Sequence, residues 1–178
     1  LALLKHPVTC TGGDDRGTHL RHTRDLELRL RRHGPAFPDA AALTGWARAT
    51  DDPTLHAWAG WLTAAVTDLT GADERPVSAW LDTLLMLAER VASGPDGTAA
   101  SSEVWQKAAG EAAAGAMALL RDEAPFGGMM SASDFAALLL RVLEDGSVPT
   151  DVPGHPLIAI QGPRETRELQ SDLVILGG

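Results

Sequence analysis

The most informative stretch for the fold of this chain is residues 155–178, which read HPLIAIQGPRETRELQSDLVILGG. Two short aliphatic runs, at 157–160 and 173–176, flank a polar and charged connection. An aliphatic run of about four to eight residues bounded by Gly or Pro is typical of a buried strand. We therefore predict a strand pair here. Because two strands cannot bury both faces by themselves, we expect a larger parent protein to supply the rest of the sheet.

The residues before this stretch have the apolar spacing of amphipathic helices. Loops rich in Gly and Pro interrupt the pattern, most clearly at 93–98 and 145–156. We expect a mainly α fold, in which a domain of about six helices over residues 1–156 precedes a short terminal strand pair over 157–178. After a helix end at 1–4, the expected helices cover 18–33, 39–49, 51–70, 76–92, 101–122 and 131–144. The expected caps are Thr18, Asp39, Asp51 or Asp52 with Pro53, Ser101 or Ser102, and Ser131 with Asp134, while the helix at 76–92 is expected to begin at Pro76 itself.

The composition limits the classes of function. Of the 178 residues, 44% are apolar but only 4% are aromatic, which suits helices packed closely through Ala and Leu. No apolar run reaches the roughly 18–20 residues that span a membrane, and no signal peptide is recognisable. Cys10 is the only cysteine, which excludes an internal disulfide and a four-thiolate metal site. We expect no membrane partner and a cytoplasmic location.

The charge is unevenly distributed along the chain. Residues 1–35 hold seven basic and four acidic residues, a net charge of +3. Since the whole chain carries −9, the remainder carries −12. An acidic body repels a phosphate backbone, so we expect weak or no DNA binding by this chain alone.

The basic end contains one cluster of arginines. On a helical wheel of residues 18–33, four of them fall on the side opposite Leu26 and Leu30. If the apolar side packs inward, the arginines face outward. These candidate contacts with DNA or a partner protein are Arg21, Arg24, Arg31 and Arg32. The alternative is an ordinary solvated helix face.

The sequence contains no recognisable catalytic or metal-binding pattern. A zinc site could be drawn from Cys10, His19, His22 and His33, because His19 and His22 are spaced for one helix face. However, His33 lies about three or four turns further on and Cys10 falls in an untethered loop, so we predict no metal and no cofactor. The glycines at 12–17 suggest a flexible loop, because they lack the Gly-Lys-Ser/Thr ending of a phosphate loop. With no Gly-x-Ser-x-Gly elbow and no arranged carboxylate pair, we predict no catalytic residue.

The tryptophans divide into two groups. Trp58, Trp80 and Trp105 lie on apolar stripes and are predicted to belong to the core. Trp61 falls off its stripe, so it is the better candidate for a surface or partner contact.

Two segments resemble a known family. The first comprises LLKHP at 3–7, RG at 16–17 and RDLEL at 24–28, and the second is the tail at 155–178. Both are similar to the B subunit of AddAB-type helicase–nucleases in its alphaproteobacterial form, and the spacing of the blocks agrees across the whole chain. In that family the last strand continues past Leu-Gly-Gly into Leu-Asn-Glu-Gly-x-Trp-Pro. The resemblance implies an internal piece of a longer subunit.

The resemblance also implies a role. In superfamily 1 helicases, a Thr-x-His-x-x-Lys-Gly-Leu-Glu motif lies between two such strands, whereas residues 161–171 have neither the His nor the Lys-Gly. The resemblance therefore implies a parent subunit with a degenerate helicase fold that guides DNA. The helices of this chain would form an insertion in its second helicase-like half, and the tail would belong to its α/β sheet. The bacterial parent would process double-strand DNA breaks with an AddA-like motor subunit. Its nuclease domain and iron–sulfur cluster would lie elsewhere, because Cys10 alone cannot hold a cluster.

Two functions of different classes therefore remain. The first is a non-catalytic scaffold within a DNA double-strand break repair helicase–nuclease. The alternative is a helical adaptor or regulatory domain that binds proteins and has no DNA role. A small helical hydrolase is not expected, because no nucleophile or metal set is recognisable.

Overall fold

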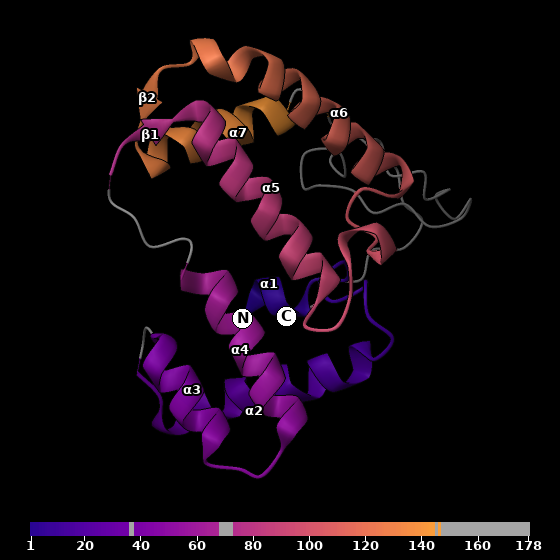
Figure 1. Cartoon of the computed structure of the whole chain (residues 1–178), viewed down its shortest axis with the longest axis vertical. Helices are drawn as coiled ribbons and strands as arrows, with labels where there is room; N and C mark the ends of the chain where they lie inside the picture. The colour runs from indigo at the N-terminus through magenta and orange to yellow at the C-terminus, as the bar shows by residue number, and fades with distance from the viewer. Residues whose placement is uncertain (36–37, 68–72, 145, 147–178) are drawn as a thin grey trace, which may run out of the picture. The chain divides into compact units, whose positions relative to one another are not determined.

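The computed structural model describes residues 1–35, 38–67, 73–144 and 146, and these residues are mainly α-helical (Figure 1). The chain divides into two compact units, Leu1–Val148 and Pro149–Gly178, and every described residue belongs to the first. The predicted mainly α fold is confirmed, with seven α-helices among the described residues. The strands predicted at 157–160 and 173–176 lie outside the described residues, so the boundary at residue 156 stays a prediction.

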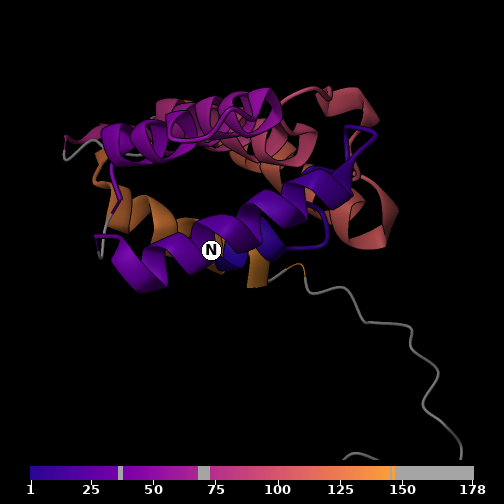
Figure 2. The same cartoon turned by 90° about the horizontal axis from the view of Figure 1, so that it is seen from below.

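The first half of the described unit holds four helices. They are α1 (Ala2–Lys5), α2 (Arg16–His33), α3 (Ala40–Arg48) and α4 (Pro53–Thr67). Helix α2 packs against α4, α1 lies against α2, and α3 lies beside α4 (Figures 1 and 2). The predicted helices of this region are therefore present, with shifts of one or two residues at most of their ends, while the predicted end of α4 at 68–70 lies outside the described residues.

Carboxylate side chains cap the helices of the first half. Asp39 and Asp52 accept hydrogen bonds from backbone amides in the first turns of α3 and α4, as predicted. The predicted cap of α2 is wrong, because the Thr18 amide donates to Asp15 Oδ1 at 2.9 Å. Asp15 is thus the cap, and α2 begins at Arg16 rather than at Thr18. A carboxylate at this position also interacts favourably with the positive end of the helix dipole.

The first hydrophobic core surrounds Trp58 on α4. The ring of Trp58 lies 6.3 Å from that of Trp46 and 6.1 Å from that of Trp61, measured between centroids. The predicted surface position of Trp61 is wrong: its side chain is 9% exposed, and its Nε1–H donates to the Arg90 carbonyl oxygen at 3.0 Å. The buried members of this core are Leu4, Cys10, Leu26, Leu43, Ala47, Leu55, Trp58, Ala59, Trp61 and Leu62.

The second half contains three longer helices, two single 3-10 turns and a small sheet. In chain order they are β1 (Arg75–Pro76), α5 (Val77–Ser93), η1 (Ala99–Ser101), α6 (Lys107–Glu123), η2 (Ala124–Phe126), β2 (Met129–Met130) and α7 (Ala132–Glu144). Strands β1 and β2 pair antiparallel in a two-stranded sheet, which is not predicted from the sequence at this place. Helix α5 begins one residue after the expected Pro76, and the expected start of α7 after Ser131 is confirmed.

Helix α6 differs most from its prediction. Ser101 and Ser102 do not cap it, because Ser101 forms a capping box with Thr98 in η1 and α6 begins only at Lys107. Helical spacing predicts an inward stripe of Trp105, Ala108, Ala112 and Leu119, which is also wrong: Ala108 and Ala112 are exposed, as is 71% of Leu119, while Met117 is buried. An Ala-rich helix is apolar on most sides, so α5 and α7 rather than the spacing select its inward face. The buried residues of this second core are Val77, Trp80, Leu81, Met117, Ala124 and Phe135.

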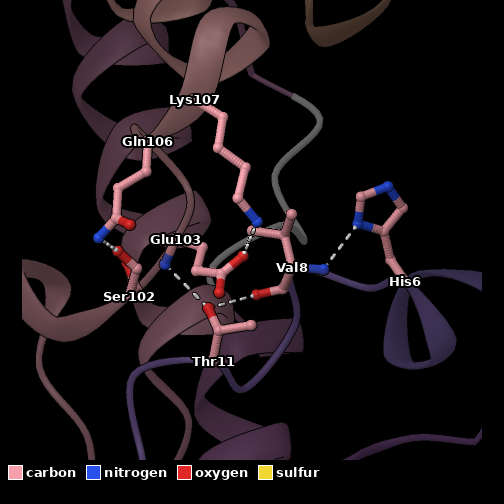
Figure 3. A network of polar contacts seen from close by, with 7 residues as sticks. All are labelled: His6, Val8, Thr11, Ser102, Glu103, Gln106 and Lys107. Atoms are coloured by element: carbon pink, nitrogen blue, oxygen red, sulfur yellow. Dashed lines mark hydrogen bonds and ion pairs between the residues drawn. The ribbon is translucent and has the colours of Figure 1, made fainter. Parts of the chain in front are cut away.

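The segment between α1 and α2 connects the two halves. The backbone amides of Cys10 and Thr11 donate to carbonyl oxygens in the last turns of α5, at 3.0 and 2.8 Å. Thr11 Oγ1 also accepts from the Glu103 amide at 2.9 Å and lies 3.0 Å from the Val8 carbonyl oxygen, to which it donates (Figure 3). Glu103 in turn pairs with Lys107 at the start of α6, at 2.6 Å (Figure 3). The amino-terminal segment is therefore bonded to both α5 and the approach to α6.

Candidate functional site

Helix α2 has one buried face and one exposed face. The buried face carries His19, His22, Thr23 and Leu26. The four candidate arginines all lie on α2 and all are exposed, and they are Arg21, Arg24, Arg31 and Arg32. The outward orientation predicted for these arginines is therefore observed.

Of these four arginines, only Arg31 forms an ion pair with a described acidic residue. Arg31 Nη2 lies 2.7 Å from Glu27 Oε1, and Lys5 Nζ lies 2.6 Å from Glu27 Oε2. Hydrogen bonds from Lys5 and then from Arg31 lower the pKa of the Glu27 carboxyl. By contrast, Arg21, Arg24 and Arg32 make no ion pair with any other residue that the structure describes. Three of the four candidate guanidinium groups thus remain available to an external anionic group.

His19 lies on the buried face of α2, and its ring contacts polar atoms of Leu4, Cys10 and Trp58. Its Nε2 lies 2.6 Å from the Leu4 carbonyl oxygen, which can only accept, so Nε2 carries the proton. Its Nδ1 is therefore an acceptor, and it receives the Nε1–H of Trp58 at 3.0 Å. Cys10 Sγ lies 3.2 Å from the same nitrogen. The imidazole of His19 consequently joins α1, the following segment, α2 and α4.

A cysteine in contact with a histidine can act as a catalytic nucleophile, but the pKa values of Cys10 and His19 oppose that role. Burial raises the pKa of the Cys10 thiol to about 12, although the nearby Arg16 charge acts in the opposite direction. Burial also lowers the pKa of His19. A nucleophilic cysteine needs its thiolate, which an adjacent imidazolium stabilises. Here both partners are held neutral, and the Trp58 N–H occupies the nitrogen that would take the proton.

Of the four residues from which a zinc site could be drawn, the structure separates His33 from the other three. His33 is exposed at the far end of α2, while His22 is buried with its Nε2 3.2 Å from Thr54 Oγ1. Cys10 is not in an untethered loop, as the sequence suggested, because its backbone amide donates to Val91 of α5. No group of three or more His, Cys, Asp or Glu side chains suited to a metal occurs within the described part of the chain.

A cavity of about 340 Å³ opens beside this cluster and is lined in part by Cys10, His19 and His22. Asp15 also lines it, but its carboxylate already accepts hydrogen bonds from the hydroxyl and the backbone amide of Thr18, and these bonds lower the pKa of Asp15. His22 is engaged with Thr54. These groups therefore hold the amino-terminal segment in place and do not converge on a ligand.

None of the helices in the described part of the chain is long and apolar enough to cross a membrane. No protein-family model, no curated protein and no solved structure matches this chain.

Proposed function

We propose that this chain is a non-catalytic helical scaffold within the B subunit of an AddAB-type helicase–nuclease that repairs double-strand DNA breaks. The resemblance of the blocks at 3–7, 16–17 and 24–28 and of the tail at 155–178 supports the family. The bonding of Cys10 and His19 supports a non-catalytic role, because their reactive atoms are committed to contacts that hold helices together.

One observation carries the proposed scaffold role. Arg21, Arg24 and Arg32 are exposed, lack a described acidic partner, and project from a helix whose opposite face is anchored in the first core. A rigid row of guanidinium groups suits contact with a phosphate backbone or with an acidic surface of a partner subunit. In the assembled bacterial complex, the partners would be DNA and an AddA-like motor subunit in the cytoplasm. The parent's nuclease and iron–sulfur centres would belong to other parts of the subunit.

The test uses the assembled complex and two charge-reversal variants. Replacing Arg21→Glu and Arg24→Glu should weaken DNA binding or subunit assembly about tenfold, while the fold survives because both side chains are exposed. If the contact is with DNA, each lost phosphate contact should reduce the slope of log affinity against log salt by about 0.9. The control is Arg121→Glu with Arg141→Glu, which changes the charge equally on exposed positions of α6 and α7.

The outcomes separate the two functions considered. Unchanged DNA binding and unchanged assembly in the Arg21 and Arg24 variant would reject the proposed contact and leave these arginines as a solvated face. Assembly that weakens without any effect on DNA would favour the protein-binding role over the DNA contact. The chain alone should show no ATPase or nuclease activity above background. Turnover that a single substitution within the chain abolishes would contradict the non-catalytic role.

A further inference from the structure

The exposed face of α2 is not purely basic. Leu20 is 37% exposed and Leu28 is 43% exposed, although leucines on a helix of this kind normally face the core. Each leucine is four residues from Arg24, so Leu20, Arg24 and Leu28 follow one another along a single row of the helix surface. Arg31 and Arg32 continue this row by one further turn. The two leucines are about 12 Å apart along the helix axis, at 1.5 Å per residue.

Such a row is the element with which helices pack on one another. Side chains four residues apart form a ridge that fits into the groove of a facing helix. Within α2, a ridge of alternating aliphatic and guanidinium side chains therefore presents apolar contact area flanked by positive charge. The ridge is held firmly, since the opposite face of α2 is bonded through His19 to α1 and α4.

We infer that the ridge Leu20–Arg24–Leu28 is a docking surface for an acidic amphipathic helix of a partner protein. This inference rests on the proposed function, because it names the partner class of the same arginine face. The partner helix would carry an aliphatic stripe for Leu20 and Leu28. Asp or Glu residues beside that stripe would pair with Arg21, Arg24 and Arg32, the three of the four candidate arginines that have no ion pair among the described residues.

The surroundings of the ridge favour a protein over a nucleic acid. A phosphate backbone has no apolar surface that would shield Leu20 and Leu28 from water, whereas an aliphatic stripe on a helix would shield them. Asp25 is exposed on the same helix, and Glu27 retains a carboxylate beside the ridge. Both carboxylates would repel a closely approaching phosphate. A protein partner can place its acidic groups against the arginines and avoid the two carboxylates.

The experiment titrates the full chain, labelled with ¹⁵N, with two probes and follows the backbone amides by NMR. The first probe is a synthetic helical peptide of about 20 residues with a Leu stripe flanked by Glu, accompanied by a version in which every Glu is replaced by Lys. The second probe is a duplex DNA of about 20 base pairs. We expect the Glu peptide to shift amides of residues 20–32, and the Lys peptide to leave them unchanged.

Variants then test the ridge itself. Leu20→Ser with Leu28→Ser, and separately Arg24→Glu, should each weaken binding of the Glu peptide about tenfold. The matched control is Leu119→Ser with Leu140→Ser, which removes two exposed leucines from α6 and α7. Circular dichroism of each variant should match the wild-type chain, because all four leucines are exposed.

The other outcomes overturn the inference in distinguishable ways. If the duplex shifts residues 20–32 and the leucine variant binds it normally, the surface is a phosphate contact, so the proposed function stands and the inference fails. If those amides instead shift with the concentration of the chain alone, the ridge joins two copies of the chain and the inference fails. If none of these titrations affects α2, the inference is rejected, whereas the proposed contact is decided by the Arg21 and Arg24 variant in the assembled complex.

Discussion

Replacing His19 with Ala tests the bonding that holds the amino-terminal segment to the first core. His19 is buried and satisfies two other buried groups, the Leu4 carbonyl oxygen at 2.6 Å and the Trp58 N–H at 3.0 Å. Each group left without a partner costs about 1–3 kcal/mol. The cavity left by the missing ring lowers the free energy of unfolding further. We expect His19→Ala to lower the free energy of unfolding by about 3–5 kcal/mol, a large part of the roughly 5–15 kcal/mol typical of a domain.

Urea denaturation followed by tryptophan fluorescence measures this loss directly. Trp58 and Trp61 lie within 6.0 and 5.9 Å of the His19 ring, so their emission reports on the same core. The control is His56→Ala, because His56 also bonds a backbone carbonyl oxygen, that of Thr50 at 2.8 Å, but is exposed. We expect the control to cost less than about 0.5 kcal/mol. Equal losses in the two variants would refute the reasoning, since burial of the bonded imidazole would then be irrelevant.

Three further predictions follow from the same region. The pKa values of His19 and His22 are lowered in the folded chain, chiefly by burial, so the unfolded chain binds more protons at acidic pH. The free energy of unfolding should therefore be highest above the ordinary histidine pKa of 6.5 and should fall below it, by up to about 1.4 kcal/mol per pH unit for each histidine. Urea titrations at pH 7.5, 6 and 5 measure this change. A flat profile would contradict this. With a pKa of about 12, the Cys10 thiol should react with a thiol reagent at pH 8 at least about a hundredfold more slowly in the folded chain than in urea, and equal rates would show an accessible thiolate. A Cβ at Gly12 would lie 2.7 Å from the Thr98 carbonyl oxygen and 2.8 Å from Ser93 Cα, so Gly12→Ala should lower the denaturation midpoint, whereas Gly45→Ala, which has open space, should not.

The outer face of α2 shows how much of the candidate site the sequence could predict. The arginines were located correctly, because helical periodicity alone places Arg21 and Arg24 opposite Leu26. The sequence does not identify Leu20 and Leu28 as exposed residues of that face, since an aliphatic residue on an amphipathic helix is ordinarily assigned to the core. Their exposure depends on where α1 and α4 contact α2, and those contacts join residues far apart in the chain.

Local chemistry determined most helix boundaries from the sequence by itself. Asp39, Asp52 and Ser131 were correctly recognised as caps, because a cap bonds amides only two or three residues away. The mainly α class followed for the same reason, since helical spacing is a short-range pattern.

Only the tertiary structure decided which residues are buried where the local pattern is ambiguous. Trp61 is buried because its indole N–H reaches Arg90 on α5, and Ser101 belongs to η1 because its hydroxyl donates to the Gly12 carbonyl oxygen at 2.7 Å. Cys10 and His19 meet in the core through bonds from the amino-terminal segment to α2 and α5. Each of these contacts depends on how separate helices pack together, and side-chain periodicity within one helix carries no information about that packing.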